Sequence, residues 1–363
     1  MNRKVKFFAA LVVVLAVLLV TCKKDKDEFS ADDAKVELKS AGQEIQANVS
    51  SIFAEPPMQS MMFLMQLLDI EDDWKSSLKS AAKEVETFNL STFNKLIREN
   101  VHLKNDGFDP DEGGEYTFNF DFDEFELTNP NVDYLMFIFP ADELAYANEQ
   151  NNAELKLNNL NIIEVEITDD WGTYYEEVLT SVNATFKIDG QQVMLCDYLA
   201  QLNEDALPVS ATFNMDMPPY QMNLTHGGSG VNYTSNAEMK HNNDVLLKYN
   251  LVIKYTSQQD DIEKVLGNFQ ISPIRFEGEM SPKALDNCSE TDISCMNNNI
   301  DVEVIQTVKN KLIGYIEFRM FYDEYWDEEY AEPVIVYSDG SWEWLFIALG
   351  LEFDDFKRGI MKR

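Results

Sequence analysis

The feature that most constrains the fold of this chain is a two-residue alternation of apolar and polar side chains. It recurs in short segments from about residue 115 to residue 337. Successive side chains of a β-strand point to opposite faces, so each segment has one face for a core and one for water. Strands of this kind pair in antiparallel sheets. The sequence therefore predicts a large, mostly antiparallel sheet.

Two details of this alternation give finer predictions. In EYTFNFDFDEFEL (115–127) the apolar positions change phase after Phe122, which predicts a β-bulge at Asp123 or Glu124. The segments VNATFKID (182–189) and VSATFNMD (209–216) share five residues in the same places. This echo predicts two neighbouring strands with the same inward side chains.

A helical pattern precedes the sheet. From Ser30, apolar residues recur at spacings of three and four, and MQSMMFLMQLLDI (58–70) is apolar almost all round. A turn-rich break, NDGFDPDEGG (105–114), ends this region, and an amphipathic pattern returns from Trp342 to Met361. We therefore predict an α+β fold: a helical region (31–104) packed on the sheet of a β-rich region (105–363), with a short C-terminal helix.

The first residues have the composition of an export signal. Arg3, Lys4 and Lys6 precede a continuous apolar run, Phe7–Val20. That run is shorter than the ~20 residues needed to span a bilayer and has the build of a secretory signal. LVTC (19–22) resembles a bacterial lipobox, although Thr21 stands where Gly, Ala or Ser is commoner. CKKDKDE (22–28) resembles the export signal of surface lipoproteins of the Bacteroidota.

The resemblance implies a cellular location but no activity. Residues 1–21 would be a lipoprotein signal peptide, and residues 22–30 a tether anchored by acyl chains such as palmitate at Cys22. The protein would then lie in the outer membrane and face the cell exterior, with the membrane as a partner through those chains. A membrane-anchor helix with an incidental cysteine is the other interpretation.

Net charge limits the partners. The formal charge is −35, and such a surface repels nucleic acid and anionic lipid. The chain is nevertheless 45% hydrophobic, which is enough to build a core.

The other cysteines fall into two groups. Cys288 and Cys295 lie in a polar loop, DNCSETDISCMNNN (286–299), and in an exported protein they would form a disulfide; a pair of free thiols is the alternative. Cys196 lies among apolar residues and is expected to be a small buried hydrophobe.

Neither metal nor catalytic motifs are strong. Asp106, Asp109, Asp111 and Glu115 form an oxygen-rich cluster that would suit calcium as a cofactor. They do not match the twelve-residue calcium loop, so an acidic turn is the favoured interpretation. The three histidines lie far apart, and no nucleophile motif is found, so we expect no enzymatic activity.

Two aromatic and acidic segments are the candidate ligand-binding surfaces: DDWGTYYEE (169–177) and FYDEYWDEEYAEP (321–333). Their candidate residues are Trp171, Tyr174, Tyr175, Tyr325 and Trp326. Such rings suit a protein partner or a glycan, because Tyr and Trp are enriched at interfaces and can stack on sugars. The alternative is that they only cover the sheet.

The sequence thus predicts a membrane-anchored envelope lipoprotein with a non-enzymatic binding or structural role. One alternative is a lipid or lipoprotein carrier built as a half-barrel, with helices laid on a curved sheet. The other alternative is a glycan-binding surface protein.

Overall fold

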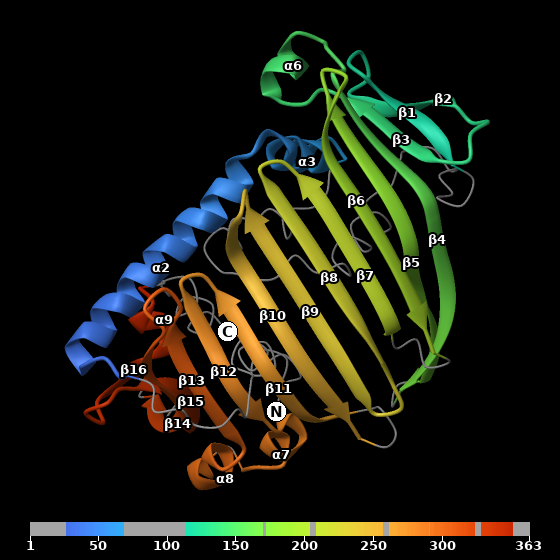
Figure 1. The fold of residues 1–363 in the computed structure, drawn as a ribbon. Helices are drawn as coiled ribbons and strands as arrows, with labels where there is room; N and C mark the ends of the chain where they lie inside the picture. Colours follow the sequence, from blue (N-terminus) through green and yellow to red (C-terminus); the bar gives the residue numbers. More distant parts are fainter. Residues whose placement is uncertain are drawn as a thin grey trace. The chain divides into compact units, whose positions relative to one another are not determined.

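A large β-sheet dominates the protein (Figure 1). The computed structural model describes residues 27–68, 113–169, 172–203, 208–256, 261–289, 291–323 and 328–350. Sixteen strands follow one another in the hydrogen-bonded order β16-β15-β14-β13-β12-β11-β10-β9-β8-β7-β6-β5-β4-β3-β1-β2. Nearly every strand therefore pairs with its neighbour in the sequence, as expected of successive hairpins.

The elements have the following bounds. The strands are β1 (Gly114–Asn119), β2 (Glu124–Asn129), β3 (Leu135–Phe139), β4 (Ala153–Asp169), β5 (Gly172–Ile188), β6 (Gln191–Leu202), β7 (Pro208–Met217), β8 (Tyr220–Ser229), β9 (Asn232–His241), β10 (Asp244–Tyr255), β11 (Ile262–Ile271), β12 (Ile274–Met280), β13 (Ile300–Gln306), β14 (Lys311–Asp323), β15 (Glu328–Val336) and β16 (Trp342–Trp344). The helices are α2 (Ala31–Ala54), α3 (Pro56–Leu67), α6 (Glu143–Ala147), α7 (Pro282–Asp286), α8 (Ile293–Asn297) and α9 (Leu345–Ala348).

The predicted α+β fold class is wrong. In the described part of the chain only α2 and α3 exceed five residues, while β4 and β5 have 17 residues each. The sheet is also mixed, because β1 pairs in parallel with β3. The predicted C-terminal helix begins instead as β16, since the alternating residues 342–344 extend the ladder beside β15. Most of the predicted helical region, residues 69–104, lies outside the described residues.

Residue contacts divide the chain into two compact units. The first unit contains Met1–Asn48, Gly227–Met239 and Asp244–Arg363, and the second contains Val49–His226 and Lys240–Asn243. Strands β10–β16 belong to the first unit, and β1–β7 belong to the second.

The core of the first unit lies between helix α2 and one face of the sheet. Ala34, Leu38 and Ala41 of α2 are buried against residues of β11–β15 such as Val302 and Ile335. Small side chains let the helix backbone approach closely: a Cβ built on Gly42 would lie 1.6 Å from the carbonyl oxygen of Leu349, which follows α9. Dense apolar packing of this kind is the main stabilising term for the unit.

The second unit has its own core on strands β3–β6. Phe139 and Phe186 are fully buried and stack with their ring centroids 6.0 Å apart. At its edge, Phe118 of β1 is directly opposite Phe125 of β2. The chain reverses at residues 120–123, where Asp123 has a φ of 58°. The predicted β-bulge is therefore wrong, because a tight hairpin causes the phase change.

The two echo segments are not neighbours either. VNATFKID lies in β5 and VSATFNMD in β7, and β6 runs between them. Val182 and Phe213 are both opposite Tyr198 of β6, so they lie on the same face of the sheet. The shared residues thus reflect two strands that flank a common partner.

The close approach of α2 to α9 gives a test of this packing. In an exposed helix, Gly→Ala stabilises by about 1 kcal/mol. Gly42→Ala should do the opposite and lower the free energy of unfolding by about 1–3 kcal/mol, because its new methyl group meets backbone. Urea unfolding measures the difference. Ser40→Ala, exposed on the same helix, should be neutral or slightly stabilising; a stabilised Gly42→Ala would contradict the contact.

Candidate functional site

Many of the predicted site residues lie outside the described residues. These are Cys22, Trp171, Tyr325, Trp326, Asp106, Asp109 and Asp111. Tyr174 and Tyr175 lie in β5 opposite residues of β4, and the description does not extend to their side chains.

Glu115 is the one calcium candidate that is described. It lies in β1, and its carboxylate accepts a hydrogen bond from the hydroxyl of Tyr134. This hydrogen bond is the main reason that the pKa of Tyr134 is raised. Across the described residues, no group of three or more His, Cys, Asp or Glu side chains is arranged to hold a metal ion.

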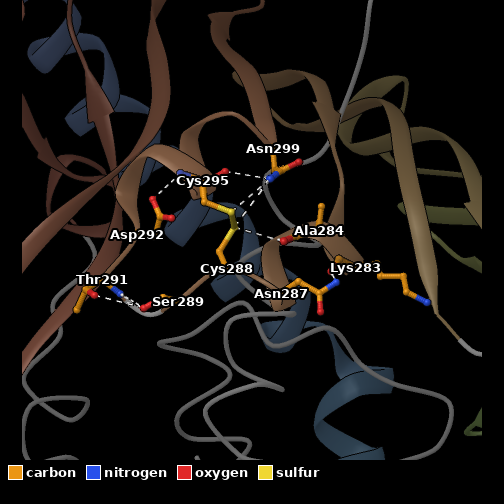
Figure 2. Close-up of a disulfide and its surroundings, with 9 residues drawn as sticks. All are labelled: Lys283, Ala284, Asn287, Cys288, Ser289, Thr291, Asp292, Cys295 and Asn299. Atoms are coloured by element: carbon orange, nitrogen blue, oxygen red, sulfur yellow. Dashed lines mark hydrogen bonds between the residues drawn. A yellow bond between two sulfur atoms is a disulfide. The ribbon is translucent and has the colours of Figure 1, made fainter.

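Cys288, two residues after the end of α7, forms a disulfide with Cys295 of α8 (Figure 2). The carboxylate of Asp292 accepts a hydrogen bond from the backbone N–H of Cys295, at 2.9 Å. The amide of Asn299 donates to the carbonyl oxygen of Cys295, also at 2.9 Å. The disulfide and these bonds fix the loop beside β13 and β14.

Cys196 lies in the second unit with its thiol unpaired. It is opposite Ala184 of β5 and Met215 of β7, on the same face as buried Phe186. Burial raises the pKa of the thiol to about 12, with a smaller contribution from the charge of Asp197. A thiol held neutral in this way is a poor nucleophile and a poor metal ligand.

The strongest candidate site is a group of aromatic rings on β14, β15 and β16 of the first unit. Phe318 of β14 and Ile335 of β15 face the core beneath α2. Side chains alternate along a strand, so Phe321 and its cross-strand partner Tyr330 lie on the opposite, outer face. Trp344 is opposite Val334 and shares that face. We call Phe321, Tyr330, Trp342 and Trp344 the outer aromatic cluster.

The rings of this cluster are in contact. The centroid of Phe321 lies 4.9 Å from that of Trp344 and 5.6 Å from that of Trp342, in edge-to-face arrangements. Tyr330 is 6.4 Å from Phe321. Such pairs are favourable beyond their buried area, by about 0.5–1.5 kcal/mol each. Trp342 remains 42% exposed, so the cluster offers an indole ring to the solvent.

Charged groups lie beside the rings on the same face. Arg319 donates from Nη2 to the Glu317 carboxylate at 2.7 Å, and it is directly opposite Glu332. Burial raises the pKa of the Glu332 carboxyl. The three groups together leave an excess of acid next to the aromatic surface.

A small pocket extends this surface along β14. It is a cavity of only about 10 Å³, room for about one water molecule, and is lined by Glu28, Leu312, Ile313, Gly314, Tyr315 and Ser338. Tyr315 is 36% exposed and lies opposite Val336, which in turn is opposite Trp342. Burial raises the pKa of the Tyr315 hydroxyl, and three nearby carboxylates raise it further. They belong to Glu28, Glu303 and Asp301.

This arrangement is suited to binding a ligand that has an apolar face and hydroxyl groups. Exposed rings can stack on an apolar ligand face, and carboxylates accept hydrogen bonds from hydroxyl groups. The predicted segment 321–333 contains Phe321 and Tyr330 of the cluster. Sequence reasoning missed Trp342 and Trp344, although the alternation in WEW (342–344) is the signal that would have placed both rings on one face.

Comparisons with known proteins add no relative. No protein-family model, curated protein or solved structure matches this chain. Among the helices of the described ranges, none combines the length and apolar character needed to cross a membrane.

The raised pKa of the partly buried Cys196 thiol predicts a loss of stability in alkali. The thiol has a pKa of about 8.5 in the unfolded chain and about 12 in the folded protein, so folding favours its neutral form. The resulting contribution to the free energy of unfolding is fully present below about pH 8.5 and is lost as the pH rises towards 12. The free energy of unfolding, measured in urea without reductant, should fall between pH 8 and pH 11 in both proteins. The fall should be about 1–3 kcal/mol smaller in Cys196→Ala than in the wild type. Equal losses in the two proteins would show that the thiol is not buried.

Proposed function

We propose that this protein is a non-enzymatic, lipid-anchored protein of the cell envelope that binds saccharides through the outer aromatic cluster. The anchor rests on the sequence alone, on the apolar run Phe7–Val20 followed by Cys22. Asp27, five residues after Cys22 in the sequence, is already hydrogen-bonded to Leu312 of β14, which leaves a short segment between the anchor and the fold.

The observation that carries the saccharide proposal is the position of Trp342. This ring is 42% exposed on the outer face, which elsewhere carries charged pairs such as Lys264–Glu279 and Arg275–Glu277. Tyr315 and the rest of the cluster flank it, together with the carboxylates of Glu317 and Glu332. A sugar ring has one apolar face and several hydroxyl groups, and this surface offers a ring for the first and acceptors for the second.

The two alternatives make different demands. A protein partner would also use exposed Tyr and Trp. A lipid or lipoprotein carrier would use the inner face, where Leu247, Tyr249 and Leu251 of β10 are only partly buried at the margin of the core. Binding of acyl lipids but not saccharides, unaffected by changes at Trp342, would favour the carrier.

Replacing the exposed ring should remove saccharide binding. Soluble glycogen, xylan, mannan and hydroxyethylcellulose are cast in native gels, and retardation of the protein identifies those that bind. Oligosaccharides of the polysaccharide that binds best are then titrated by calorimetry. Trp342→Ala should raise their dissociation constant at least tenfold, which corresponds to a loss of about 1.4 kcal/mol of binding free energy.

Tyr322→Ala is the matched control. Tyr322 is an exposed aromatic residue of the same strand (57% exposed), but it lies on the other face of β14. Its loss should change the dissociation constant less than twofold. Equal weakening in both variants, or no retardation of the wild type by any of the four polysaccharides, would contradict the proposal.

The anchor has a separate test. A bacterial culture that expresses the full chain is fed an alkyne-labelled fatty acid. The wild type should carry the label and fractionate with membranes, and Cys22→Ala should do neither, because the acyl chains are attached to the Cys22 residue. A labelled Cys22→Ala protein would show that this cysteine is not the site.

A further inference from the structure

The first described residues are bonded to the start of strand β14. The backbone N–H of Phe29 donates to the carbonyl oxygen of Leu312 at 3.0 Å, and the N–H of Leu312 donates to the carbonyl oxygen of Asp27 at 3.0 Å. The hydroxyl of Ser338 also donates to the carbonyl oxygen of Phe29, at 2.9 Å. The tether is thus attached to the fold at a defined point of the first unit.

The direction of this pairing shows where the tether comes from. Glu28 and Leu312 form a parallel bridge, so both chains run the same way at this point. The residue before Glu28 therefore lies on the side of Lys311. That side is the turn of residues 307–310 between β13 and β14, which we call the anchor turn.

The anchor turn has an unusual surface for this protein. Val308 is 81% exposed, the highest value among the large hydrophobic side chains of the described residues. The ammonium groups of Lys309 and Lys311 lie 5.5 Å and 4.9 Å from the ring centroid of Phe29. Lys309 also forms an ion pair with Glu37, which orients its side chain beside the turn.

Chain length limits how far this turn can be from a membrane. Asp27 is five residues beyond Cys22, and an extended chain spans at most about 3.5 Å per residue. The anchored end of the tether therefore lies within about 18 Å of Asp27. The anchor turn begins beside Leu312, to which Asp27 is bonded, so it is within reach of the same lipid surface.

We infer that the anchor turn lies against the membrane, with Val308 among the lipid headgroups and Lys309 and Lys311 next to their phosphates. This inference rests on the proposed acylation of Cys22. Asp27, Glu28 and Glu37 also lie near the turn, so the acyl chains supply the attachment, and the turn sets which end of the first unit faces the lipid.

The orientation also places the binding surface. Trp342 is opposite Val336, which is opposite Tyr315, four residues beyond Lys311 on β14 or about 13 Å along an extended strand. Phe321 is six residues further along the strand, so the outer aromatic cluster begins near the anchor turn and extends away from the lipid surface.

A fluorescent label at the anchor turn tests the inference. Full-length protein carrying Cys196→Ala and Val308→Cys is labelled with NBD at residue 308, and acylation of Cys22 is verified by mass spectrometry. It is incorporated into vesicles of phosphatidylethanolamine and phosphatidylglycerol that contain a headgroup nitroxide. We expect NBD emission at residue 308 to be quenched at least twofold more strongly than at residue 252 in the matched Val252→Cys protein, because Val252 is an exposed valine in the middle of β10.

The outcomes separate the two proposals. Strong quenching at residue 308 and weak quenching at residue 252 would support the orientation. Acylated protein with equal quenching at both sites, or stronger quenching at 252, would overturn the orientation and leave the anchor intact. Absence of acyl chains on Cys22 would overturn the anchor, and the inferred orientation with it.

Discussion

The register of β14 is the constraint on which the outer aromatic cluster depends. Side chains alternate, so a shift of one residue would move Ile316 and Phe318 out of the core and Phe321 into it. The buried pairing of Ile316 with Ile335 opposes such a shift. Asn297 of α8 adds a specific lock, because its side chain accepts from the N–H of Phe318 at 2.6 Å and donates to the carbonyl oxygen of Phe318 at 3.1 Å. The Cys288–Cys295 disulfide in turn holds α8, so the disulfide loop supports the outer face indirectly.

Where the strands beside β14 end, other residues form hydrogen bonds with its backbone N–H and C=O groups. Buried or partly buried backbone groups must find partners, and unpaired strand edges invite association with other chains. At the start of β14, the pairing with β15 reaches only to Tyr315. The backbone of Leu312, before that point, is instead hydrogen-bonded to Asp27 and Phe29. On the other side of β14, the pairing with β13 extends only to Ile316. Beyond it, the side chain of Asn297 accepts the hydrogen bond from the backbone N–H of Phe318. Residues far apart in sequence thus complete one ladder.

Local patterns predicted strands better than they predicted their partners. The alternation predicted the β-rich region, and α2 and α3 lie where the three-and-four spacing predicts helices. The phase change near Asp123 could not distinguish a bulge from a hairpin, since both shift the alternation by an odd number of residues. The order of β5, β6 and β7 depends on long-range pairing that similarity between segments does not encode. The aromatic site was predicted only in part, because Phe321 and Tyr330 meet Trp342 and Trp344 through the hairpins and not through proximity in sequence.

The rings of the outer aromatic cluster differ in how much they contribute to the stability of the fold. Val334 is on the outer face, opposite Trp344, and yet has no exposed surface. Rings near it therefore contribute to stability by keeping water from an apolar side chain. Trp342 is opposite Val336 at the edge of the sheet and keeps 42% of its surface exposed. The inner face already supplies the core of this unit, so the exposed part of Trp342 is not required for folding. This exposed part of the ring, next to the rest of the cluster, is the surface on which the proposed ligand would stack.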